Sequence, residues 1–169
     1  APVEEMRGIA LDTRPDQVTL VPERREEITT EGGLDASGQM DRLAAIIDPI
    51  QEAKILVSLF IDPEPHQIEA AHRLGASYIE LNTAAYSEAR NPEAAGREIS
   101  ALKKAAEQAH ALGLGVHAGH GLTFLNVEPI ASLPHIEELN IGHSIVSQAV
   151  FTGFEAAVCE MARLVEGRS

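Results

Sequence analysis

Short β-like runs alternate with helical stretches along almost the whole chain, and this alternation constrains the fold more than any other feature. Helical patterns are expected at Val3–Leu11, Gly38–Gln51, Glu64–Leu74, Pro92–Leu112, Asn126–Ser132 and Ser144–Val165. Strand-like runs separate them at Gln17–Val21, Lys54–Ile61, Ser77–Leu81, Gly115–Ala118 and Glu138–Ile141. The alternation predicts a parallel sheet with helices packed on it, in a single domain spanning residues 1–169.

Two α/β architectures fit this pattern, an open doubly wound sheet and a closed (β/α)₈ TIM barrel. A complete barrel needs about 250 residues. The chain has 169 residues, which is too few to close a barrel. The element pattern alone therefore favours the open sheet.

Composition and charge exclude several classes of partner. The net charge of −13 argues against nucleic acid, because phosphate backbones require basic surfaces. The longest apolar run, within Ile55–Ile61, is too short to span a bilayer, and no secretory signal pattern is present. The single cysteine, Cys159, cannot form an internal disulfide, which suits a cytoplasmic protein.

The connection Pro22–Asp35 is long and polar for a segment that directly follows a strand. It contains two arginines, several carboxylates, two threonines and the pair Gly32–Gly33, which can act as a hinge. A connection of this kind is often a lid over a binding site. An ordinary surface loop is the alternative interpretation.

A carboxylate interrupts the strand-like segment Tyr78–Asn82. Alternation places Tyr78, Glu80 and Asn82 on one face and the two apolar residues on the other. A strand covered by helices on both faces is normally apolar throughout. Glu80 must therefore be paired, protonated or functional, and a structural hydrogen bond explains it as well as catalysis does.

Two imidazoles lie where the strand of residues 115–118 runs into a glycine-rich turn. His120, between two glycines, is expected at the carboxyl end of its strand, where barrel enzymes place catalytic groups. Its neutral-range pKa suits proton transfer. A metal site formed by His117, His120 and His143 is the alternative, but the spacing matches no common metal motif.

The last strand-like segment ends in Asn140–His143, and a long helical pattern starts at once. The free backbone N–H groups at a helix N-terminus bind anions such as phosphate. Gly142 would allow a phosphate to approach the main chain, and His143 would add a donor. A tight strand-to-helix turn also favours glycine, so the pattern alone is weak.

Four segments of the chain resemble the pyridoxine 5′-phosphate synthase family. They are Leu20–Asp35, Val57–Asp62, Ala118–Thr123 and Glu138–Ile145, and they occur in the family's order and spacing. The resemblance implies that the five strands are the fourth to eighth of a (β/α)₈ barrel. It also implies the condensation of 1-deoxy-D-xylulose 5-phosphate with 3-amino-2-oxopropyl phosphate by acid–base catalysis, without metal or organic cofactor. The products are pyridoxine 5′-phosphate, phosphate and water.

The resemblance also assigns roles to particular residues. His120 matches the family's proton donor, and Glu80 matches a carboxylate that stabilises a transition state. The substrate-binding positions match Thr29, Gly121, Gly142 and His143, the last two at the phosphate of the aminoketone. The chain departs from the family beside Glu80, where Asn82 and Ala84 replace a histidine and a glycine.

Further family residues lie on three strands that precede the position matching Ala1. If the chain truly begins at Ala1, the resemblance implies that these 169 residues alone have no synthase activity. It also implies homo-oligomers, commonly octamers built from dimers, to whose interfaces the three preceding strands contribute. Two rival functions remain, an inactive or ligand-binding pseudoenzyme and another sugar-phosphate barrel enzyme. A Schiff-base aldolase is disfavoured, because no lysine is expected at the carboxyl end of a strand.

Overall fold

The computed structural model describes residues 1–22 and 32–167. The strands are β1 (Gln17–Leu20), β2 (Leu56–Ile61), β3 (Tyr78–Asn82), β4 (Gly115–Gly119) and β5 (Ile136–Asn140). The helices are α1 (Glu4–Thr13), α2 (Met40–Glu52), α3 (Pro65–Arg73), α4 (Ala84–Ser87), α5 (Pro92–Ala111), α6 (Val127–Ala131), α7 (His143–Thr152) and α8 (Phe154–Val165). The predicted alternation of strands and helices is confirmed.

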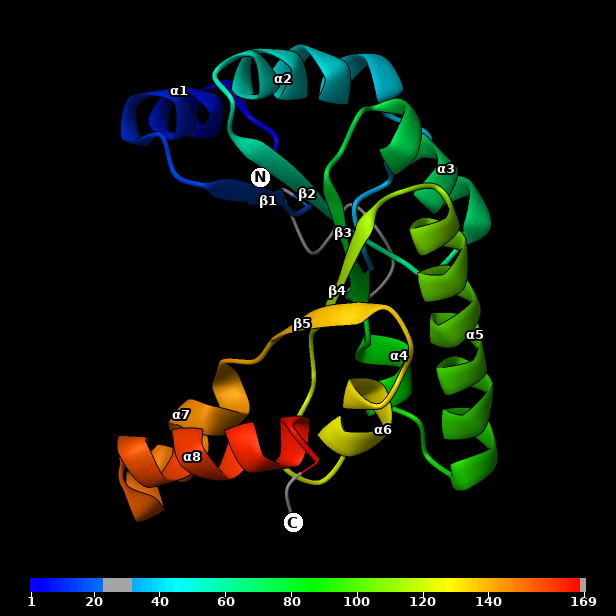
Figure 1. Ribbon diagram of the computed structural model, residues 1–169, viewed down its shortest axis with the longest axis vertical. Helices are drawn as coiled ribbons and strands as arrows, with labels where there is room; N and C mark the ends of the chain where they lie inside the picture. Colours follow the sequence, from blue (N-terminus) through cyan, green and yellow to red (C-terminus); the bar gives the residue numbers. More distant parts are fainter. Residues whose placement is uncertain (23–31, 168–169) are drawn as a thin grey trace.

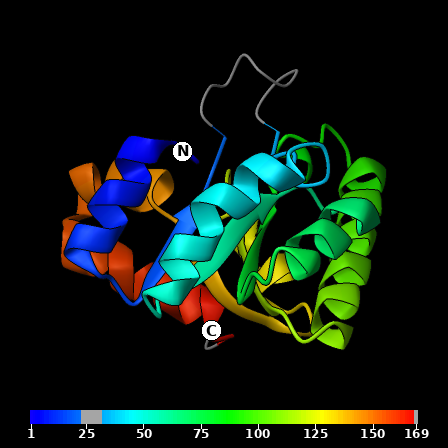
Figure 2. The same cartoon turned by 90° about the horizontal axis from the view of Figure 1, so that it is seen from above.

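The five strands form one parallel sheet in the order β1-β2-β3-β4-β5. Each strand pairs with the one before it, whereas a doubly wound sheet reverses its order at a switch point. The chain therefore does not follow the doubly wound pattern. The strands lie along the inner side of a C-shaped arrangement, with helices on its outside (Figure 1). Figure 2 shows helices α2, α3 and α5 against the strands from above.

The outer face of the sheet, which meets the helices, forms the hydrophobic core. Alternation sends every second side chain of a strand to this face, and these side chains are aliphatic. The fully buried members are Val57, Leu59, Ile61, Ile79, Leu81 and Ala118. Helix residues in the same hydrophobic cluster are also fully or almost fully buried, among them Leu43, Ile47, Ile68 and Leu102. Burial of this apolar surface is the main force that holds the layers together.

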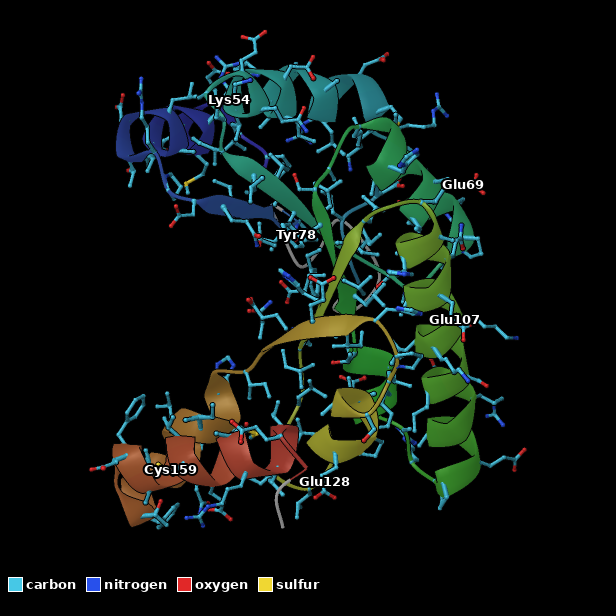
Figure 3. All side chains as sticks on the ribbon, viewed as in Figure 1. Lys54, Glu69, Tyr78, Glu107, Glu128 and Cys159 are labelled. Atoms are coloured by element: carbon cyan, nitrogen blue, oxygen red, sulfur yellow. The ribbon has the colours of Figure 1, made fainter. Side chains whose placement is uncertain are left out.

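The inner face of the sheet is polar in its centre and at its carboxyl end. The register aligns Phe60, Glu80 and His117 across β2, β3 and β4. Tyr78, which Figure 3 labels on the inner side of the curve, packs its ring against His117 at 4.7 Å between ring centroids. The predicted two-faced character of β3 is therefore confirmed.

Glycines follow the ends of two helices. Gly75 and Gly113 follow the ends of α3 and α5 with φ of 71° and 81°, a left-handed conformation that side chains disfavour. The single helix expected at Ser144–Val165 is wrong. Gly153 adopts φ 85° and ψ 151°, so the chain leaves the helical region there and forms α7 and α8 instead.

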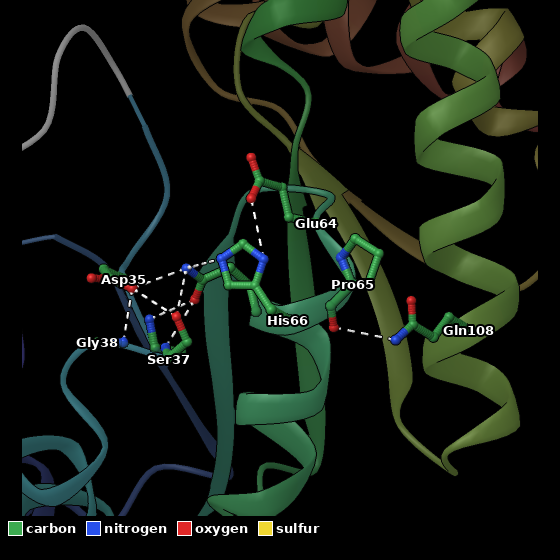
Figure 4. A network of polar contacts seen from close by, with 9 residues as sticks. Asp35, Ser37, Gly38, Glu64, Pro65, His66 and Gln108 are labelled. Atoms are coloured by element: carbon green, nitrogen blue, oxygen red, sulfur yellow. Dashed lines mark hydrogen bonds and ion pairs between the residues drawn. The ribbon is translucent and has the colours of Figure 1, made fainter.

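A partly buried polar network fixes the chain where it returns to the sheet after residues 23–31, which lie outside the described part (Figure 4). The Gln67 side chain accepts hydrogen bonds from the N–H groups of Ala36 and Ser37 and donates one to Asp35 Oδ1 at 2.9 Å. This bond from Gln67 is the main cause that lowers the pKa of Asp35. The network anchors the end of the long connection against α3.

Several helices of the described chain carry exposed carboxylates. Glu69, Glu107 and Glu128, which Figure 3 labels, are exposed on α3, α5 and α6. Cys159 is exposed as well. Within the described residues, no helix has the length and apolar character needed to cross a membrane.

Candidate active site

A cavity of about 950 Å³ opens at the carboxyl ends of the strands. Its lining comes from the carboxyl ends of all five described strands and the start of α7, and includes Phe60, Glu80, His120, Asn140, Gly142 and His143. The His120 imidazole and Gly142, directly before α7, therefore lie at the same edge of the cavity. Parallel strands place their carboxyl ends at one edge, and this edge is the usual location of a site in α/β proteins.

His120 occupies a strained backbone position directly after β4. Its φ of 85° lies in the left-handed region, which non-glycine residues seldom adopt. The hydroxyl of Thr83, itself fully buried, lies 2.5 Å from the His120 carbonyl oxygen and 2.8 Å from that of Gly119. Thr83 thus holds the backbone on both sides of the β4 end. The imidazole faces the Phe60 ring at 6.2 Å between centroids.

Glu80 is half-buried on the inner face and points toward the same cavity. Burial raises the pKa of its carboxyl above the usual value, because desolvation penalises the charged form. A hydrogen bond with the Asn140 side chain opposes this rise in pKa, and so does the imidazole of His120. The neighbouring carboxylate of Glu138 adds to it. A carboxyl group with a raised pKa next to an imidazole is suited to proton transfer.

The residues that replace the expected histidine and glycine beside Glu80 have defined partners. Asn82 donates a hydrogen bond to Asp62 Oδ1 at 2.9 Å and accepts one from the Ala84 N–H at 3.0 Å. The same Asp62 oxygen accepts from the Gly33 N–H at 3.0 Å. Asn82 therefore connects β3 to the end of the long connection after β1.

The N-terminus of α7 forms the opposite wall of the cavity. Gly142 is the N-cap residue and carries no capping side chain, while His143 is the first helical residue. The Ser144 hydroxyl donates to the Leu122 carbonyl at 2.9 Å, which ties this helix start to the turn after His120. The helix dipole and its N–H groups favour an anion at this position.

The three-histidine metal site is not assembled. Within residues 1–22 and 32–167, no group of three His, Cys, Asp or Glu side chains is placed to hold a metal ion. His120 and His143 line the cavity, whereas His117 is 4 % exposed and packs against Tyr78. No lysine is among the residues that line this cavity in the described chain.

Thr29 lies outside the described residues, so its predicted contact stays a prediction. The residues that border this segment, Val21, Pro22 and Gly32, line the cavity. Sequence reasoning missed Asn140 and Thr83. The asparagine could have been found from its position at a strand end, two residues before the predicted phosphate site.

Comparisons with known proteins found a family model and relatives that match almost the whole chain. A family model described as "Pyridoxal phosphate biosynthesis protein PdxJ" matches residues 1–167. The chain is 56% identical over 168 residues to a protein named pyridoxine 5′-phosphate synthase from Gloeothece citriformis, covering 99% of this chain and 70% of that protein. It is 58% identical over 167 residues to a protein of the same name from Cyanothece sp., with the same coverage.

One solved structure shows a similar fold. It is titled "Crystal Structure of Xylose isomerase domain protein from Planctomyces limnophilus" and superposes with a TM-score of 0.53 at 14% identity. The match covers 94% of this chain and 65% of that chain. At this identity the likeness concerns the fold alone.

Proposed function

The chain belongs to the PdxJ family of pyridoxal phosphate biosynthesis proteins, and we propose from this premise that it is a pyridoxine 5′-phosphate synthase. The reaction condenses 1-deoxy-D-xylulose 5-phosphate with 3-amino-2-oxopropyl phosphate to pyridoxine 5′-phosphate, phosphate and water. The supporting observation is that His120, Glu80 and the N-terminus of α7 line one cavity. Proton-transfer groups thus face a phosphate-binding helix end across a single space.

The proposed roles follow the geometry of the cavity. His120 gives a proton to the reacting centre, and the Glu80 carboxylate stabilises positive charge that develops beside it. Gly142 and His143 bind the phosphate of the aminoketone at the start of α7, and the Gly121 backbone contacts ligand. Thr29 binds the sugar phosphate. The net charge of −13 opposes phosphate binding globally, so these local donors must supply the attraction.

We also propose that the five strands are the fourth to eighth of a (β/α)₈ barrel within a single domain. Three observations support this assignment: sequential parallel pairing, helices on the outside of the curve, and the 70% of its relatives that the chain covers. β1 and β5 each have only one paired neighbour among the described strands. The homo-oligomer that the family resemblance implies stays a prediction.

A chimera tests the proposed activity. Residues 1–167 would replace the matching part of the Gloeothece relative, so that this chain's residues act within a full-length synthase. We expect formation of pyridoxine 5′-phosphate from both substrates, measured by chromatography, and a fall on the order of 10²- to 10⁴-fold for His120→Asn.

The matched control is His110→Asn, which changes an exposed histidine of α5 outside the cavity and should leave turnover unchanged. A folded chimera without product, or one in which both histidine variants behave alike, would contradict the proposed function.

A further inference from the structure

Three neighbouring strands contribute one residue each to a contact beside the candidate catalytic groups. Glu80 lies on β3, Gly119 on β4 and Asn140 on β5. The register pairs Gly119 with Asn140 and places Glu80 opposite His117, one step earlier along the inner face. The Glu80 side chain therefore reaches diagonally across β4 to meet a residue of β5.

Gly119 leaves the space through which this contact is made. A Cβ atom at this position would lie 2.4 Å from Glu80 Oε1. It would also lie 3.0 Å from the Asn140 carbonyl oxygen and 3.1 Å from the Asn140 Cβ. Any side chain here would push the carboxylate away from β5, because the Asn140 backbone cannot yield. The contact between Glu80 and Asn140 therefore requires glycine at position 119.

The titratable groups around Glu80 act on its carboxylate in opposite directions. The titratable groups nearby are His117 on β4, His120 directly after β4, Glu138 on β5 and Asp62 directly after β2. Glu138 repels the carboxylate, the His120 imidazole attracts it, and Asp62 accepts a hydrogen bond from Asn82. The side-chain amide of Asn140 is the neutral donor that interacts with Glu80 on the cavity side.

We propose that Asn140 is a positioning residue that holds the Glu80 carboxylate toward the cavity across Gly119. The amide aims the carboxylate at the space next to His120 and favours its ionised form there. This inference rests on the proposed function, because it assigns the contact a purpose in catalysis. Asn140 itself transfers no proton.

The test measures the pKa of Glu80 in the ligand-free chain by NMR with ¹³C-labelled glutamate. Asn140→Leu keeps the size of the side chain but removes its donor, and Gly119→Ala separates the pair sterically. We expect both variants to raise the pKa of Glu80, because each removes a hydrogen bond to the charged form. The double variant should raise the pKa no further than the larger single effect.

Asn91→Ala is the matched control. Asn91 caps α5 at an exposed position and does not line the cavity, so its loss should lower stability without moving the pKa of Glu80. An unchanged Glu80 pKa in Asn140→Leu overturns the proposal, even if Gly119→Ala does not fold. Fully additive shifts in the double variant also overturn it.

The measurement needs neither substrate nor turnover. A failure of this inference is therefore separate from a failure of the proposed function, which the chimera tests.

Discussion

The two faces of the sheet are stabilised by different kinds of interaction. On the outer face, Val57, Leu59 and Ile79 are completely buried against helices, and each apolar side chain fits without a specific partner. On the inner face, Glu80 and Asn82 depend on particular groups from other strands. Apolar packing is non-directional, whereas a buried polar group needs a donor or acceptor in the right place. The outer face therefore specifies the fold, and the inner face specifies the chemistry.

The inner face also contains polar groups whose requirements are not fully met. Within the described residues, Ser58 Oγ and His117 Nδ1 are buried without a hydrogen-bond partner. His117 Nδ1 lies 3.8 Å from Glu138 Oε1, which is too long for a hydrogen bond but close enough for an ion pair if the imidazole is protonated. The outer face has no comparable group among its buried strand residues.

The largest expected effect on stability comes from the outer face. Ile79→Ala removes a fully buried side chain from the middle of the sheet and leaves a cavity. We expect a loss of about 2–5 kcal/mol in the free energy of unfolding, measured by urea denaturation of the chain. Val150→Ala, at a residue that is 79% exposed on α7, should change it by less than about 0.5 kcal/mol. Similar losses in both would show that burial does not distinguish these positions.

A substitution at Thr83, beside the carboxyl end of β4, should lower both the free energy of unfolding and the activity. Thr83→Val removes the hydroxyl that holds the carbonyl groups of Gly119 and His120. The lost hydrogen bond should cost about 1–3 kcal/mol of unfolding free energy. Turnover of the chimera should fall as well, because His120 would no longer be held at its positive φ.

Thr83→Ser keeps the hydroxyl and is the conservative control for this position. It should retain most of the turnover while losing the contacts of one methyl group. Equal turnover in Thr83→Val and the unmodified chimera would show that the hydroxyl has no role in placing the imidazole.

Glu80 should make stability depend on pH. Burial raises the pKa of this carboxyl in the folded chain, so the folded state binds its proton more tightly than the unfolded state does. The associated stability is fully present below the unfolded-state pKa, falls as pH rises toward the folded-state pKa, and is constant above it. Glu80→Gln removes the titration, so the difference between the two chains should show this trend in urea denaturation at successive pH values. An opposite slope would mean that hydrogen bonding, not burial, dominates.

Much of the outer face could be predicted from the sequence, but contacts on the inner face could not. The alternation of Ile79 and Leu81 with polar residues is local, and so are the glycines that end α3 and α5. The Thr83–His120 contact joins residues 37 positions apart, and Glu80 meets Asn140 across an intervening strand. Such contacts depend on strand register, which one sequence does not reveal. The break at Gly153 was missed because glycine also occurs inside helices, at a modest cost.

Of these variants, controls aside, Ser58→Ala should change the free energy of unfolding least. It also tests the difference between the two faces of the sheet most directly. Ser58 is completely buried on the inner face of β2, and its hydroxyl has no hydrogen-bond partner in the described part of the chain. Removing an unsatisfied hydroxyl should be neutral or stabilise the fold by about 1 kcal/mol, since the desolvation penalty disappears with it. Ser132→Ala is the control, because that exposed hydroxyl donates to the Glu128 carbonyl. If Ser58→Ala instead lowers the free energy of unfolding by more than about 1 kcal/mol, the hydroxyl has a partner and the inner face is as well satisfied as the outer one.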